Sequence, residues 1–159
     1  MMSAALTLVL GLALGPSPLE VALDDEYKAQ AMYQAAIANF GDITPFRNIV
    51  LAEGNHISLL KVEMERLNVP IPKNPYAKRS NETIPEWTQR LKLPGTSVET
   101  CRLAARLEEE NVALYDKLIA KTTDQQVILV FQRLQADSRD RHLPAFRRCA
   151  ERGGGNRPR

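Results

Sequence analysis

Cysteine is scarce in this chain, which has only Cys101 and Cys149 among its 159 residues. Two cysteines are too few for a scaffold of several disulfides or for a zinc site built from cysteine alone. They would form one disulfide in an exported protein, whereas in the cytosol they would be two buried thiols. A chain of this length with 44% hydrophobic residues can bury a substantial core as a single domain.

The chain also lacks an excess of charge of either sign. Its 21 basic and 19 acidic residues leave a formal net charge of +2, which gives no electrostatic reason to expect a nucleic-acid partner. Part of the positive excess lies in residues 152–159, whose glycines and arginines are typical of a flexible basic tail.

No hydrophobic run is long enough to span a membrane, so we expect no stable membrane insertion of the mature domain. The apolar residues 4–14 are typical of the hydrophobic part of a secretory signal, with a cleavage site at Ala13-Leu14-Gly15. Against a signal, no Lys or Arg precedes this run, and Pro16 follows the cleavage site. Residues 1–16 are therefore interpreted either as a signal peptide of a secreted or periplasmic protein, or as an apolar extension that packs on the domain or a partner, with the protein then cytoplasmic.

The sequence shows no strand-like alternation, and its apolar residues recur in steps of three and four, as on one face of a helix. The capping box Ser17-Pro18-Leu19-Glu20 predicts the start of a first helix, which Gly41 ends. A second helix is predicted from Thr44-Pro45 to Asn68.

A second helical pair is predicted after residue 95. Thr96-Ser97-Val98-Glu99 reads as another capping box, and Thr123-Asp124 caps the last helix. That last helix is predicted to be continuous, with an inward line of Ile128, Phe131, Gln135, Ser138, His142, Ala145 and Cys149.

A long proline-rich stretch, residues 69–95, separates the two helical pairs, and a short helix is predicted within it at 86–91 around Trp87. A stretch of this length between helices is unusual unless it crosses the domain. The predicted fold class is therefore all-α: an antiparallel four-helix bundle over residues 17–151, made of two helical hairpins joined by a long crossover.

The two hairpins repeat each other. Tyr33 and Tyr115 are 82 positions apart, and the same offset places Glu26 on Glu108. The repeat predicts a pseudo-twofold axis with equivalent residues facing each other. It is broken in the second hairpin, where Gln135 and Ser138 replace Glu53 and His56. His142 falls one turn further along, at the position equivalent to Leu60.

Five polar residues lie on the predicted core lines. Unpaired buried carboxylates are costly, so such groups are normally paired or bound to metal, and carboxylate with imidazole suits iron, manganese or zinc. The candidate ligands are Glu26, Glu53, His56, Glu108 and His142.

Three motifs carry a resemblance to the ferritin-like superfamily of rubrerythrin-like bundles: Glu26-x6-Tyr33, Ala52-Glu53-x2-His56 and Glu108-x6-Tyr115. In that superfamily two helices each give a glutamate, and the other two each give Glu-x-x-His. Over residues 19–150 the chain is more closely similar to a small uncharacterised bacterial and archaeal family of ferritin-like proteins. The signatures for this second likeness are Pro45-Phe46-x-Asn48-Ile49, Asn111-Val112-Ala113-Leu114-Tyr115-Asp116 and Arg141-His142-Leu143-x-Ala145-Phe146.

The resemblance implies a metal site of one or two ions, with iron favoured and manganese or zinc as alternatives. It also implies oxidation of ferrous iron by oxygen or peroxide, so an enzyme of this kind would be a ferroxidase or a peroxidase-like oxidoreductase. Members of the superfamily often self-associate, which makes a homo-oligomer an open expectation. The chain departs from the superfamily pattern at Gln135 and Ser138, which are poor ligands.

Two considerations keep a metal-free interpretation open. A first turn centred near residues 42–43 places Glu53 about six residues, or about 9 Å, from the level of Glu26. Glu26 and Glu108 could also form a polar core network with Tyr33, Tyr115 or Gln135, without metal. The alternative function is then a degenerate metal-free bundle that acts as an exported structural or interaction module.

Overall fold

The computed structural model describes residues 15–153, all of whose regular structure is helical, so the expectation of an all-α fold is confirmed. The predictions for residues 1–14 of the apolar segment and for 154–159 of the tail lie outside the described residues. The helices, in chain order, are α1 (Pro18–Phe40), α2 (Phe46–Arg66), α3 (Ile84–Arg90), α4 (Ser97–Ala120), α5 (Gln125–Asp137), the π-helix η1 (Ser138–His142) and α6 (Leu143–Glu151).

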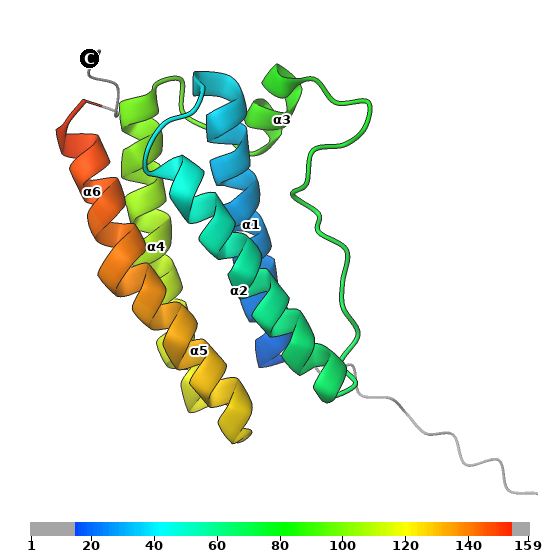
Figure 1. Cartoon of the computed structure of the whole chain (residues 1–159). Coiled ribbons are helices and arrows are strands. Elements are labelled where there is room, and N and C mark those ends of the chain that lie inside the picture. The colour runs from blue at the N-terminus through cyan, green and yellow to red at the C-terminus, as the bar shows by residue number, and fades with distance from the viewer. Residues whose placement is uncertain (1–14, 154–159) are drawn as a thin grey trace, which may run out of the picture.

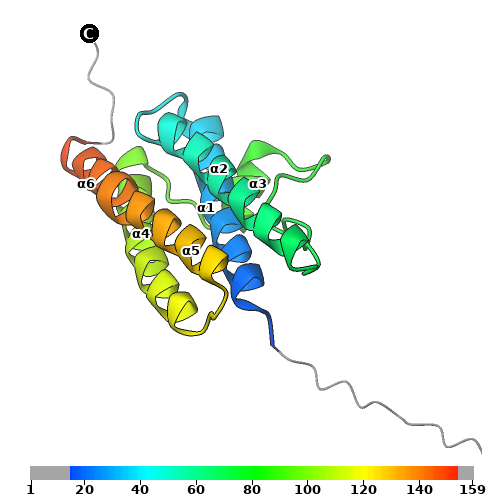
Figure 2. The same ribbon diagram turned by 60° about the horizontal axis from the view of Figure 1, so that its bottom comes forward.

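The long helices lie side by side as two antiparallel hairpins (Figures 1 and 2). Short loops join α1 to α2 and α4 to α5, and η1 continues α5 into α6 along one axis. Contacts between α1 and α4 and between α2 and α5 hold the two hairpins together. None of the helices in the described range is long and apolar enough to cross a membrane.

The helix starts follow the predicted capping chemistry. The Ser17 hydroxyl accepts from the backbone N–H of Glu20, whose carboxylate accepts from the backbone N–H of Ser17. The Asp124 carboxylate caps α5 by accepting from the backbone N–H groups of Gln126 and Val127. Each such cap satisfies amides that have no partner within the helix.

The box predicted at the start of α4 forms only in part. The Thr96 hydroxyl accepts from the backbone N–H of Glu99, as expected, but the Glu99 carboxylate accepts from that same hydroxyl, at 2.8 Å, instead of from the backbone.

The core has three layers along the axis of the helices. One apolar layer contains Leu23, Leu60, Tyr115 and Phe131. The other surrounds three aromatic rings, those of Tyr33, Phe46 and Phe146, whose centroids are 4.9–5.7 Å apart. Between these layers each long helix contributes buried polar residues: Glu26, Glu53, His56, Glu108, Asn111, Ser138 and His142.

The last helical run is not the continuous α-helix that the sequence predicts. At Ser138–His142 it widens into a π-helix, in which the backbone N–H of Leu143 bonds the carbonyl of Ser138. Pro144 explains this break, because its nitrogen carries no hydrogen and cannot donate to the carbonyl four residues earlier. The predicted inward line is also wrong at two positions, since Ile128 and Ala145 are only partly covered. Their neighbours Val127 and Phe146 are buried instead.

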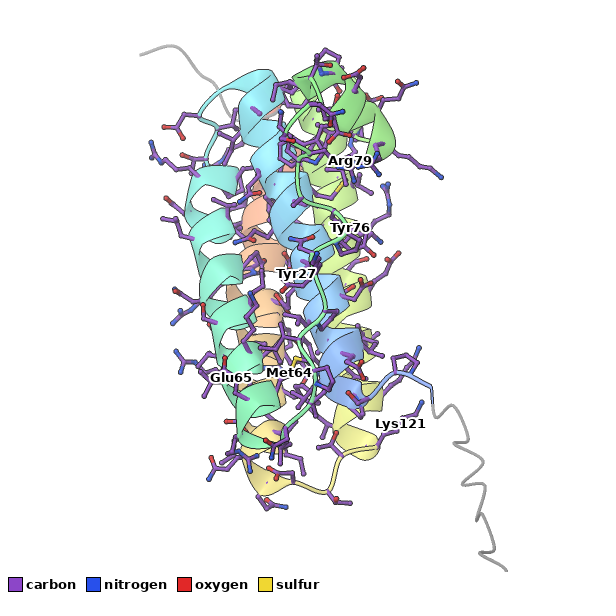
Figure 3. All side chains as sticks on the ribbon, turned by 90° about the vertical axis from the view of Figure 1, so that its right-hand side faces the viewer. Tyr27, Met64, Glu65, Tyr76, Arg79 and Lys121 are labelled. Carbon is purple, nitrogen blue, oxygen red and sulfur yellow. A yellow bond between two sulfur atoms is a disulfide. The ribbon has the colours of Figure 1, made fainter. Side chains whose placement is uncertain are left out.

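The crossover between α2 and α4 runs along the outer face of α1, where Figure 3 shows Tyr76 near Tyr27. The Tyr76 hydroxyl donates to Asp24 on α1, at 2.8 Å, and its backbone carbonyl accepts from the Trp87 indole, at 2.9 Å. Trp87 is buried against Ala31 and Ala35 of α1. The predicted short helix around Trp87 is therefore present as α3, and it fixes the crossover to the first hairpin.

A disulfide joins Cys101 of α4 to Cys149 of α6 and closes a loop of 48 residues in sequence separation. A cross-link of this kind stabilises a fold mainly by restricting the unfolded chain, and typically contributes about 2–4 kcal/mol. The two cysteines are therefore bonded to each other in the structure and are not two separate buried thiols.

We predict that replacing both cysteines, as C101A/C149A, lowers the free energy of unfolding by about 2–4 kcal/mol. Denaturant unfolding followed by circular dichroism would measure the change, with the wild-type protein in reducing buffer as a second comparison. An unfolding midpoint equal to that of the oxidised wild type would contradict a stabilising disulfide.

Candidate metal centre

The polar layer brings all five candidate ligands together in the middle of the helices. Glu26 comes from α1, Glu53 and His56 from α2, Glu108 from α4 and His142 from η1. None of the five side chains belongs to a residue that is more than 3% exposed. The helical spacing of these residues, combined with packing of the four helical runs, places them on facing inner surfaces.

The first group of ligand atoms surrounds the imidazole of His56. Its Nδ1 lies 3.1 Å from Glu26 Oε2 and 3.0 Å from Glu53 Oε2. The predicted offset between the levels of Glu53 and Glu26 therefore does not keep them apart, because both long carboxylate side chains reach the same nitrogen.

The second group surrounds His142. Its Nδ1 lies 3.1 Å from the other oxygen of Glu53, Oε1, and 3.5 Å from Glu108 Oε2. Within residues 15–153 this nitrogen has no aligned hydrogen-bond partner, although it is buried. The two imidazole rings stack, with centroids 5.4 Å apart. Glu53 is thus shared, with one oxygen turned to each histidine.

Two buried tyrosines complete the symmetry between the hairpins. Tyr33 donates to Glu108 Oε1 and Tyr115 donates to Glu26 Oε1, both at 2.6 Å. Each tyrosine therefore bonds the glutamate of the other hairpin, which the repeat of 82 positions requires of a pseudo-twofold pair. Burial and the adjacent carboxylates raise the pKa of both hydroxyls well above the ordinary value, so they remain donors.

The fourth helical run departs from this symmetry. Gln135, the counterpart of Glu53, turns away and donates to Asp116 Oδ1 at 2.7 Å and to the Val112 carbonyl at 2.9 Å. Ser138, the counterpart of His56, is buried but too short to replace an imidazole. The less tightly wound η1 instead brings His142 to the inner surface, although the repeat predicted it one turn too far along.

The charges in this layer are strongly coupled. Burial raises the pKa of Glu26 to about 7, with a further increase from Glu53. Burial opposes the charged form of each imidazole, but Glu26 and Glu53 raise the pKa of His56 to about 11, and Glu108 and Glu53 raise that of His142 to about 9. Burial would also raise the pKa of Glu53, but the two histidines lower it. Without metal, protons on the imidazoles balance part of the carboxylate charge at neutral pH.

Three residues near the ligands are absent from the sequence-based prediction. Asn111 donates to Asp25 Oδ2 at 2.8 Å and to Glu26 Oε1 at 3.3 Å. Burial raises the pKa of Asp25 to about 6. Asp137 Oδ2 lies 3.5 Å from His56 Nε2. Asn111 could have been found, because it lies three residues after Glu108 on the same helix face. Asp25 and Asp137 flank core positions, and spacing alone gives no signal for them.

The donor set fits divalent metal ions. Two triads, Glu26–Glu53–His56 and Glu53–Glu108–His142, each have ligand atoms within 4.8 Å of one another. Carboxylate oxygens and imidazole nitrogen together suit iron, manganese and zinc. The buried Nδ1 of His142 lies close to two carboxylates without an aligned hydrogen bond to either within the described range, and after losing its proton it would offer a lone pair to a metal.

Comparison with known proteins agrees with this fold. The uncharacterized protein MJ0754 of Methanocaldococcus jannaschii is 27% identical over 137 residues, which cover 84% of this chain and 73% of that protein. A crystal structure of the hypothetical protein MJ0754 from Methanococcus jannaschii matches with a TM-score of 0.69 and 23% identity, covering 92% of this chain and 88% of the other. The model of the uncharacterized protein domain DUF2202 matches residues 20–158, and the chain therefore belongs to the DUF2202 family.

Proposed function

We propose that the chain is a ferritin-like four-helix bundle that binds two divalent metal ions in its polar layer, with iron favoured. One ion would be held by Glu26, Glu53 and His56, and the other by Glu53, Glu108 and His142. The observation that carries this proposal is the position of Glu53, whose two oxygens lie 3.0 and 3.1 Å from two different histidines.

Energetics support metal binding over an empty polar core. Three carboxylates and two imidazoles in a dry layer lose much of their hydration, and they require compensating charge. Two divalent ions would supply four positive charges, of which the three carboxylates would neutralise three. The hydroxyls of Tyr33 and Tyr115 would hold the outer oxygens of Glu108 and Glu26 in place, as supporting hydrogen bonds commonly do around metal ligands.

The chemistry of the proposed site follows from the metal. Bound ferrous iron would supply electrons to oxygen or peroxide, which is the reaction that the ferritin-like resemblance implies. The residues of the chain would bind and orient the ions, and the apolar layers on either side would exclude bulk water. Manganese or zinc would occupy the same donors, and zinc would leave the site without redox chemistry.

A second candidate is a metal-free structural or interaction module. It is favoured by Gln135 and Ser138, which supply no ligand on the fourth helical run, and by hydrogen bonds that already engage Glu26 and Glu108. The disulfide supports an exported protein under either proposal, because such bonds persist in oxidising compartments. Stoichiometric metal binding separates the two candidates.

We predict that wild-type protein reloaded with ferrous iron under nitrogen holds two ions per chain. Glu53→Gln removes a ligand of both ions and should abolish loading, whereas His56→Ala or His142→Ala should each remove one ion. Elemental analysis of tag-free protein measures the content, and circular dichroism checks the fold.

Glu63→Gln is the matched control, because Glu63 is also buried on α2 but pairs with Arg66 away from the polar layer. Its iron content should equal that of the wild type. Well-folded wild type without iron, manganese or zinc would refute the metal proposal and leave the structural module.

Metal binding should also release protons and strengthen as pH rises. In the metal-free protein the pKa values of about 11 for His56 and about 9 for His142 keep both imidazoles protonated at pH 7. Because each must lose its proton to bind, about two protons should leave the imidazoles of each loaded chain, and affinity should rise about tenfold per pH unit for each. Glu26, whose pKa is about 7, should release part of a third proton below pH 8. Calorimetry in buffers of different ionisation enthalpy between pH 6 and 8 measures this number. Affinity that is independent of pH would contradict the proposed ligands.

A further inference from the structure

We infer that the two halves of the proposed metal site are not equivalent: the Glu53–Glu108–His142 half has an open position for one water-sized ligand, and the Glu26–Glu53–His56 half is closed. This inference rests on the proposed function and adds where a ligand can reach the ions. It is drawn from a cavity beside one triad and from the hydrogen bonding of the two outer glutamates.

The cavity lies between α1 and α4. Its volume of about 10 Å³ has room for about one water molecule. Glu53, Glu108 and Tyr33 line its inner side, and Ala29 and Leu107 line its apolar walls. The charged side chains of Asp25 and Lys28 also line it. Of the five candidate ligands, Glu53 and Glu108 belong to the lining, and the other three do not. Glu108, which belongs to the second triad alone, therefore borders space that a small ligand can occupy, whereas its counterpart Glu26 in the first triad does not.

A buried oxygen without a hydrogen-bond partner lies on a residue that lines the cavity, and it indicates a ligand that donates a hydrogen bond. Asn111 lines the cavity and is 5% exposed. Its amide nitrogen is used by Asp25 and Glu26, which fixes the orientation of the side chain. Its Oδ1 has no hydrogen-bond partner within residues 15–153, and buried polar atoms are normally satisfied.

The two outer glutamates, Glu26 and Glu108, differ in how fully their oxygens are engaged, and the less engaged one belongs to the second triad. Glu26 is fully engaged, since Oε1 accepts from Tyr115 and Asn111 and Oε2 lies beside His56. Glu108 accepts from Tyr33 through Oε1, while its Oε2 lies 3.5 Å from His142. The second half therefore has fewer protein contacts to give up when an additional ligand binds.

The chemical class of this ligand follows from hydrogen bonding and size. Asn111 Oδ1 and the carboxylate of Asp25, which also lines the cavity, accept hydrogen bonds, and this favours a ligand that donates one. A cavity of about 10 Å³ holds one such particle but excludes larger anions at this position. Water and hydroxide meet both conditions. Fluoride is similar in size to hydroxide and would replace either of them on the ion, so it is the probe that can be titrated.

The test uses the full chain loaded with Co(II), whose visible absorption reports a change of ligand. The single-histidine variants separate the two halves: His56→Ala keeps only the second ion, and His142→Ala keeps only the first. Fluoride should change the spectrum of the wild type and of His56→Ala, and it should not change the spectrum of His142→Ala. Equal responses of both variants, or no response of the wild type, would overturn the inference.

A second comparison tests the cavity without touching a ligand. Ala29→Leu or Leu107→Phe should fill the cavity and weaken fluoride binding at least tenfold while cobalt content stays at two ions. Ala38→Leu, on the exposed side of the same helix, is the matched control and should bind fluoride like the wild type. Unchanged fluoride binding in both filled variants would overturn the inference, even if loading confirms the metal site. A wild type that takes up no cobalt would instead refute the proposed function.

Discussion

The carboxylate of Glu53 lies between two imidazoles in a dry layer, and much of the surrounding structure serves to make that arrangement stable. Its oxygens lie 3.0 Å from His56 Nδ1 and 3.1 Å from His142 Nδ1. A buried charge in this position is costly unless opposite charge and hydrogen bonds surround it. Glu26 and Glu108 add further negative charge and are each bonded by a tyrosine of the other hairpin. The layer therefore needs cations, which are protons without metal and, in our account, metal ions when it is loaded.

The repeat explains why the layer is nearly symmetric, and its broken half explains why the two sides differ. Tyr33 with Glu108 mirrors Tyr115 with Glu26. The fourth helical run has lost the Glu-x-x-His pattern, and Gln135 now bonds Asp116 on the neighbouring helix. Pro144 interrupts the α-helical hydrogen bonding there, and the resulting π-helix turns His142 inward. One glutamate therefore serves both histidines where the symmetric pattern would have supplied two.

Much of this could be predicted from the sequence, because helix periodicity, caps and the repeat are local signals. Ser17 and Asp124 cap where expected, Trp87 lies in a short helix, and Cys101 is bonded to Cys149. The five candidate ligands share one layer because each lies on the inner face of its helix. The predictions that failed depend on three-dimensional geometry that the helical periodicity of the sequence does not contain. A π-helix at Ser138–His142 interrupts the helix that was predicted to be continuous, and long side chains closed the offset between Glu26 and Glu53. Asn111 and Asp25 matter through a contact between α1 and α4.

The most direct test of the shared role of Glu53 is anomalous diffraction from crystals soaked in Mn(II), collected at the manganese edge. Two peaks should appear in the polar layer, one between Glu26 and His56 and the other between Glu108 and His142, with an oxygen of Glu53 on each. This result would establish a pair of ions bridged by one carboxylate. A single peak, or a layer without anomalous signal while His56 and His142 remain beside Glu53, would contradict the account.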